Sequence, residues 1–155
     1  MKKNYKRGIT FLELLIVVAV LGVIFSVVIP QFSKSREMQV LKSGVVDILS
    51  SIDKARGETL SSLNSSSYGV HFQSDKVIIF KGTGFIPDTV GNEIIDIVTP
   101  ASITNVTIGI VSGSSGEIFF NRLSGSPSAT ATVTISTINY SKIITISATG
   151  VASSD

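Results

Sequence analysis

The hydrophobic pattern sets the N-terminal part of the chain apart from the rest. Residues 9–29 (ITFLELLIVVAVLGVIFSVVI) form a run of twenty-one positions that are nearly all apolar, with one charge, at Glu13. At about 1.5 Å rise per residue, a helix of this length crosses the roughly 30 Å hydrocarbon core of a bilayer. The pattern therefore predicts a transmembrane helix over 9–29.

From residue 30 to residue 60 the apolar positions recur every three or four residues, which is the period of an amphipathic helix. This apolar stripe consists of Met38, Leu41, Val45, Ile48, Ile52, Ala55 and Thr59, widened by Val40, Leu49 and Leu60. Gly44 and Gly57 are expected to weaken the helix locally. Because isolated helices are marginal in water, we expect the stripe to pack on the following domain, with a coiled coil to another chain as the alternative.

Beyond a serine-rich, polar and flexible linker at 61–67 the period changes to two, and β-branched and aromatic residues dominate. The expected strands are 68–73, 76–81, 93–98, 103–111, 117–122, 131–138 and 142–148. Strands at this spacing, joined by turns and without a second helix, indicate stacked antiparallel sheets. The sequence thus predicts an α+β fold, in which the long N-terminal helix packs on an antiparallel β-sandwich head at 61–155.

The charges around the apolar run predict its orientation. Four cations, Lys2, Lys3, Lys6 and Arg7, precede it, and the next Lys or Arg is Lys34. By the positive-inside rule the N-terminus is cytoplasmic and the head lies beyond the membrane. The whole chain carries +2, but without its first eight residues it would have nine cations and eleven anions, a net −2. Composition therefore gives no reason to expect nucleic-acid binding.

Glu13 is the one charged residue of the apolar run, and its presence there needs a chemical explanation. A carboxylate in such a helix costs about 2–3 kcal/mol on insertion scales. The Glu13 carboxylate could remain hydrated if it lies near the lipid headgroups. Alternatively, cleavage between Gly8 and Ile9 would create an α-amino group four residues before Glu13, one helical turn away. That amine, on the same subunit or on a neighbour, would neutralise the carboxylate.

These residues resemble the class III signal of type IV pilins and type II secretion pseudopilins. The resemblance lies in a short basic leader, 1–8, that ends in Gly8 and is followed by Ile-Thr-Phe-Leu-Glu-Leu-Leu. Gly22 and Pro30 also lie where that family has a glycine and a helix-loosening proline. The resemblance implies that a prepilin peptidase cuts after Gly8 and N-methylates Ile9, where phenylalanine or methionine is more usual. It further implies that Glu13 acts in assembly.

The second half of the chain carries a narrower resemblance. The order of its segments is similar to that of H-type minor pseudopilins and related minor type IV pilins. This order is the helix, the serine linker, a Tyr-Gly-Val strand, Gly-Glu-Ile-Phe-Phe at 116–120 and Ile-Thr-Ile-Ser-Ala-Thr-Gly at 144–150. The head of those proteins is a two-sheet β-sandwich behind the long helix. Residues 82–111 contribute nothing to this resemblance.

Enzymatic chemistry is not expected from this composition. The chain has no cysteine and one histidine, which argues against zinc ligand sets and cysteine nucleophiles. The histidine, His71, alternates with core positions of its strand and is expected to point into solvent. Asp88, Glu93 and Asp96 are candidate calcium ligands, but their spacing fits no known loop pattern. We therefore predict no enzyme activity, no metal and no cofactor.

Together these features predict a structural subunit of a type IV pilus or a type II secretion filament. The resemblance implies as partners other pilin or pseudopilin subunits, the prepilin peptidase and an inner-membrane assembly platform. The subunit would begin as a single-pass protein of the cell membrane and later join an extracellular or periplasmic filament. Two alternatives remain, a competence pilin that handles DNA and a membrane-tethered binding domain outside any filament.

Overall fold

The computed structural model describes residues 9–155, so the expected leader at 1–8 and its cleavage-site residue Gly8 lie outside the described residues. The chain divides into two units, Met1–Arg36 and Glu37–Asp155. One helix, α1 (Phe11–Leu60), contributes to both units. The remaining elements, all in the second unit, are a short 3-10 helix and the strands of two antiparallel sheets. The predicted α+β class is therefore confirmed.

In the first unit, α1 carries the apolar run. It is long and apolar enough to cross a membrane, and none of its most apolar stretch is buried against protein. A helix from the core of a soluble protein would be largely buried, so the exposed apolar surface indicates membrane anchoring. The helix is continuous through Gly22 and Pro30. Their role as points of flexibility stays a prediction.

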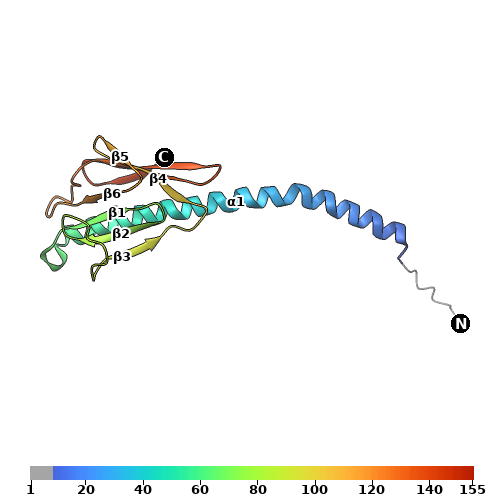
Figure 1. Ribbon diagram of the computed structural model, residues 1–155, viewed down its shortest axis with the longest axis horizontal. Coiled ribbons are helices and arrows are strands. Elements are labelled where there is room, and N and C mark those ends of the chain that lie inside the picture. Colours follow the sequence, from blue (N-terminus) through green and yellow to red (C-terminus); the bar gives the residue numbers. More distant parts are fainter. Residues whose placement is uncertain (1–8) are drawn as a thin grey trace. The chain divides into compact units, whose positions relative to one another are not determined.

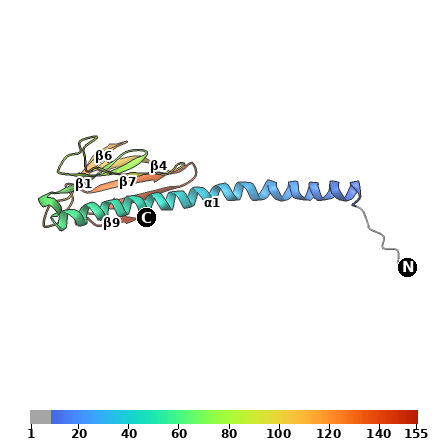
Figure 2. The same cartoon turned by 90° about the horizontal axis from the view of Figure 1, so that it is seen from below.

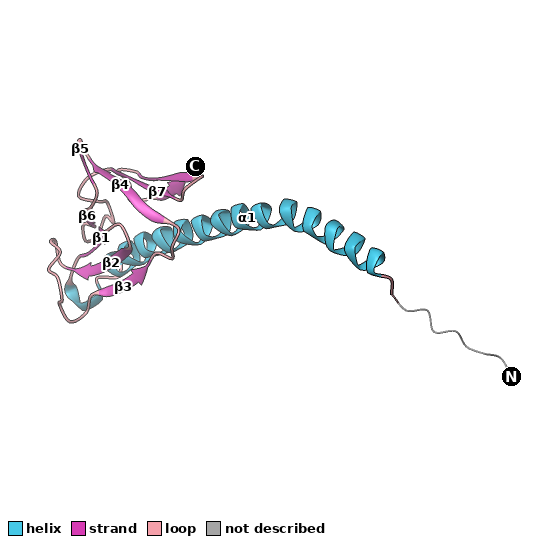
Figure 3. Ribbon diagram, turned by 45° about the vertical axis from the view of Figure 1, so that its right-hand side comes forward, coloured by secondary structure: helices cyan, strands magenta, loops and turns pink. Residues whose placement is uncertain are grey.

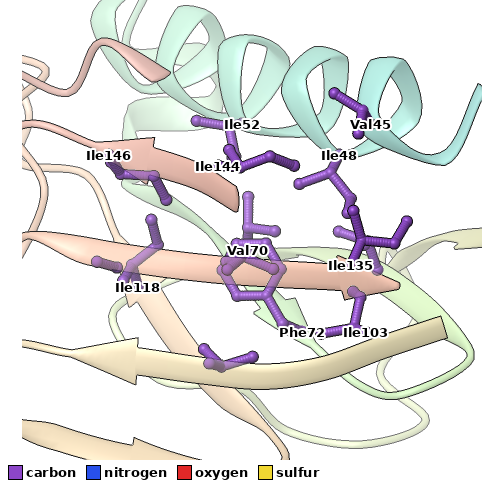
Figure 4. Close-up of a cluster of buried hydrophobic side chains, with 14 of the residues drawn as sticks. Val45, Ile48, Ile52, Val70, Phe72, Ile103, Ile118, Ile135, Ile144 and Ile146 are labelled. Atoms are coloured by element: carbon purple, nitrogen blue, oxygen red, sulfur yellow. The ribbon is translucent and has the colours of Figure 1, made fainter. Parts of the chain in front are cut away.

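In the second unit, the C-terminal part of α1 lies alongside the strands (Figures 1 and 2). The buried members of the apolar stripe are Leu41, Val45, Ile48, Ile52, Ala55 and Thr59. Met38 and Leu60, at the two ends of the stripe, are 40% and 42% exposed. The buried positions pack into the core of the head, as Figure 4 shows for three of them, which confirms the predicted packing of the helix on its own domain.

Gly44 corrects one expectation, because it allows close packing where the sequence suggested only a weak point in the helix. It is buried, and a Cβ atom at this position would lie 2.6 Å from Cδ1 of Ile135. The missing side chain therefore lets the helix backbone approach the sheet. Gly57, by contrast, has open space where its Cβ would be.

The strands form a four-stranded sheet and a five-stranded sheet (Figure 3). The first sheet has the order β3-β2-β1-β6 and consists of β1 (Tyr68–Phe72), β2 (Lys76–Lys81), β3 (Glu93–Asp96) and β6 (Gly116–Phe119). The second has the order β5-β4-β7-β8-β9 and consists of β4 (Ser102–Ile108), β5 (Val111–Gly113), β7 (Ala131–Ser136), β8 (Ser141–Ile146) and β9 (Ala152–Ser154). All the neighbouring strands in this list are antiparallel.

Both sheets share one hydrophobic core with α1 (Figure 4). The first sheet contributes Val70, Phe72, Val77, Ile79 and Ile118, and the second contributes Ile103, Val106, Val133, Ile135, Ile144 and Ile146. In most strands these residues alternate and so lie on one face of their sheet. In β4 the register shifts between Ile103 and Asn105, which brings Ile103 and Val106 to the same buried side. The head therefore has a single packed interior, in keeping with a chain that has no cysteine to cross-link it.

The predicted strand ends shift by up to three residues, as in β6, which ends at Phe119 and not at 122, and three further features differ from the predicted elements. The strand expected over 103–111 ends at Ile108, because Gly109 has a φ of +59° and the chain turns back into β5. The strand β9 was not predicted, and it pairs with β8. The serine-rich linker contains a 3-10 helix, Leu63–Ser65, beside the last turn of α1.

Thr59 connects the last turn of α1 to the first strand. Its Oγ1 accepts the backbone N–H of Tyr68 at 2.8 Å and donates to the carbonyl of Ala55 at 2.8 Å. The side chain is fully buried. Thr59→Val would keep the shape of the side chain and leave the Tyr68 N–H without its partner, a loss that typically costs about 1–3 kcal/mol.

We therefore expect Thr59→Val to lower the urea midpoint of the head, as measured by circular dichroism. Thr59→Ser is the matched control, because it retains the hydroxyl, and it should lose less stability than the valine variant. Equal midpoints for Thr59→Val and the wild type would contradict this role of the hydroxyl.

Candidate functional site

The first turn of α1 contains Glu13, the one charged residue of the apolar run. The helix begins at Phe11, and Thr10 lies immediately before it. The Oγ1 atom of Thr10 accepts the backbone N–H of Glu13 at 3.2 Å. A threonine that bonds the N–H three residues later is an N-cap, and Thr-x-x-Glu is the sequence of a capping box. Thr10 thus defines the start of the helix, a role that the Thr-x-x-Glu pattern indicates and that is separate from the predicted role of Glu13.

Glu13 lies in the first helical turn, where the helix dipole favours a negative charge. This position gives the carboxylate a local stabilisation of typically 0.3–1 kcal/mol at exposed sites. The cost of placing it in a membrane helix is larger, about 2–3 kcal/mol. The local effect therefore does not offset the cost, and a cationic partner is still needed if this turn enters lipid or a packed helix bundle.

The side chains around Glu13 are exposed in the single chain. Ile9 is 79% exposed, Phe11 81% and Leu12 69%, and the apolar residues of the following turns are also exposed. Such a continuous apolar surface is stable against lipid or against other apolar helices, and unfavourable in water. The first unit therefore presents one carboxylate at the start of an otherwise apolar helix.

A metal centre finds no support among residues 9–155. No group of three or more His, Asp or Glu side chains in this part of the chain is arranged to hold a metal ion. Asp88, Glu93 and Asp96, the candidate calcium ligands, do not form such a group.

His71 lies differently from what the sequence suggested. It points away from the core, as expected, but its side chain is only 15% exposed. The ring of Phe85 stacks on the imidazole, with centroids 4.1 Å apart and an interplanar angle of 10°. The segment that joins β2 to β3 carries Phe85 onto this face of the sheet. The expectation of a solvated His71 was therefore wrong, because strand alternation identifies the face of a side chain and not the loop that covers it.

The environment of His71 disfavours its charged form. Its Nδ1 atom lies 3.4 Å from Oε2 of Glu117 on β6, yet it is buried and has no hydrogen bond of good geometry. Its Nε2 atom lies 3.2 Å from Nε2 of Gln73. Burial lowers the pKa of His71 below its ordinary value of 6.5, and the Glu117 carboxylate partly opposes this effect.

The family comparison concerns the N-terminal segment. Residues 3–29 match the family model described as the prokaryotic N-terminal methylation motif. The matched stretch includes Gly8, Ile9, Glu13 and the whole expected membrane span. It supports a place in the pilin and pseudopilin superfamily, whose proteins with this motif are structural and not enzymatic. Neither curated proteins nor solved structures give a match to this chain.

Proposed function

We propose that this protein is a structural subunit of a type IV pilus or a type II secretion filament, processed at its N-terminus and assembled through α1. The observation that carries the proposal is the combination of the methylation motif with an exposed apolar helix whose first turn holds one carboxylate. The head is a helix packed with two antiparallel sheets, and a minor subunit of the H type is the narrower proposal.

Processing is the first step of this proposal. The precursor is anchored in the cell membrane by residues 9–29, with the basic leader in the cytoplasm and the head beyond the membrane. A prepilin peptidase cuts between Gly8 and Ile9 and methylates the new terminus. The leader and its four cations are then lost. What remains at the start of the helix is one cation, the α-amino group of Ile9.

Assembly is the second step. An assembly platform in the inner membrane extracts the subunit from lipid and packs its helix among those of its neighbours. In that water-free helix bundle an unpaired Glu13 carboxylate would destabilise the assembly, because buried charges are tolerated only when they are paired. Pairing with the Ile9 amine of an adjacent subunit satisfies both groups. The requirement for this pair sets the axial register between neighbouring subunits.

Cysteine cross-linking tests whether the helices pack together. The chain has no cysteine, so introduced pairs report without background. The test variant carries two cysteines in the same chain, one near the start of the apolar helix (Val17→Cys) and one near its end (Val27→Cys). In cells that make filaments, we expect its oxidation to give cross-linked species larger than a dimer. Leu123→Cys, on an exposed position of the head, is the control and should give at most dimers. Monomers alone would instead support a membrane-tethered domain that stays outside filaments.

A further inference from the structure

The segment between β2 and β3, residues 82–92, covers part of the outer face of the β3-β2-β1-β6 sheet. It is attached there through Phe85, which stacks on His71 and also contacts the edge of Phe80, with centroids 5.8 Å apart. The backbone N–H of Phe85 donates to Oε2 of Glu117 at 3.3 Å. One residue of the loop thus makes both an aromatic contact and a polar contact with the sheet.

The loop has internal structure of its own. The carbonyl of Ile86 accepts hydrogen bonds from Thr89 Oγ1 at 3.1 Å and from Asn92 Nδ2 at 2.9 Å. Gly82 and Gly91, near its two ends, have φ values of +115° and +109°, a conformation that other residues rarely adopt. The loop therefore has a defined conformation of its own and contacts the sheet through Phe85.

The loop and the sheet enclose a pocket of about 380 Å³. Half of the residues that line it are polar, and its apolar lining residues are Ile78 and Ile94 of the sheet and Phe85, Pro87 and Val90 of the loop. Ile78 is only 5% exposed. Displacement of the loop would therefore remove the pocket and uncover apolar side chains of the sheet.

The surroundings of His71 favour a neutral imidazole over a charged one. A proton on His71 would place a charge on a ring that is only 15% exposed and stacked against Phe85, and Nδ1 has no good hydrogen-bond partner there. The one carboxylate within 4 Å of the ring, among the described residues, is Glu117 of β6. Its side chain is 42% exposed, so water screens its attraction. The other charged side chains of this face are Lys76 of β2, Asp96 of β3 and Asp88 of the loop.

We propose that residues 82–92 form an acid-released latch, in which protonation of His71 detaches Phe85 and opens the outer face of the β3-β2-β1-β6 sheet. The sign follows from the two states of the imidazole. With the loop open, His71 is solvated and titrates near its ordinary value of about 6.5. With the loop closed, burial lowers the pKa of His71. Acid therefore favours the open state, by at most tenfold per pH unit between the two pKa values.

Hydrogen exchange of the Phe85 amide, which donates to Glu117, tests the latch in the full chain held in detergent micelles. After correction for the intrinsic pH dependence of exchange, we expect the opening constant of this amide to rise as the pH falls from about 7.5 to about 5. Amides of the core strand β7 serve as the internal control and should show no such rise. Exchange at Phe85 that is unchanged or slower in acid would overturn the proposal, because it would mean that the attraction of Glu117 for the imidazolium equals or outweighs the cost of desolvation.

Two variants identify the titrating group. His71→Phe keeps a ring beneath Phe85 and removes the proton site, so its loop exchange should be independent of pH over this range. Glu117→Gln keeps an acceptor for the Phe85 N–H and removes the charge that favours the imidazolium. Its loop should therefore open by a larger factor in acid than that of the wild type. A His71→Phe variant that retains the wild-type pH dependence would also overturn the proposal.

Discussion

Replacing Glu13 with alanine is expected to abolish incorporation into filaments while leaving cleavage after Gly8 and folding of the head intact. The substitution leaves the Ile9 amine of a neighbouring subunit unpaired among apolar helices. Removing one partner of a buried ion pair typically costs about 3–5 kcal/mol, which corresponds to a loss of more than about a hundredfold in the assembly equilibrium. The measurement is the amount of subunit in sheared filaments relative to the amount in membranes.

Two further variants separate charge from helix capping. Glutamine at position 13 can still complete a capping box with Thr10, because Gln serves at that position as Glu does. If the charge is what matters, Glu13→Gln should fail as Glu13→Ala does. Glu58→Ala, which removes a carboxylate from the C-terminal part of the same helix, should assemble normally. Normal entry of Glu13→Ala or Glu13→Gln into filaments would rule out the charge-pair mechanism.

Replacing Gly8 with a bulky residue such as leucine is expected to leave the precursor uncut. The family resemblance implies that the peptidase cuts directly after this glycine. The uncut chain would keep its four leader cations and would lack the free amine at Ile9, so it should also be absent from filaments. Immunoblots of whole cells would show one band, heavier than the mature wild-type protein.

Gly22→Ala is the matched control for this experiment. It changes another glycine of the N-terminal segment, and a Cβ atom at position 22 has no neighbour within 4 Å. Its precursor should be cut like the wild type. Full processing of the Gly8→Leu protein would contradict the assigned cleavage site.

The regular elements of the head could be predicted because burial imposes a period on the sequence. The stripe from Leu41 to Thr59 repeats every three or four residues since one helix face packs on the core, and β7 alternates since one face of its sheet does. The loop at 82–92 has no such period, because contacts with the outer face of the sheet hold it in place. The strand β9 is too short, at three residues, to show alternation.

In the candidate site, too, features with a local sequence pattern could be predicted and those without one could not. Glu13 stood out in the sequence because a carboxylate in an apolar run needs a physical reason. The Thr-x-x-Glu pattern is also enough to predict the cap by Thr10, because it is the sequence of a capping box. The cover of Phe85 over His71 could not be inferred, because the two residues are separated by a turn, a strand and part of a loop. No local pattern relates them.

The chemical identity of the native N-terminus tests the proposed mechanism most directly. Protein isolated from the cells that make it would be digested, and its first peptide sequenced by tandem mass spectrometry. We expect that peptide to begin at Ile9 and to carry one methyl group on its α-nitrogen. A native protein that retains residues 1–8 would contradict the mechanism, since no amine would then exist to pair with Glu13.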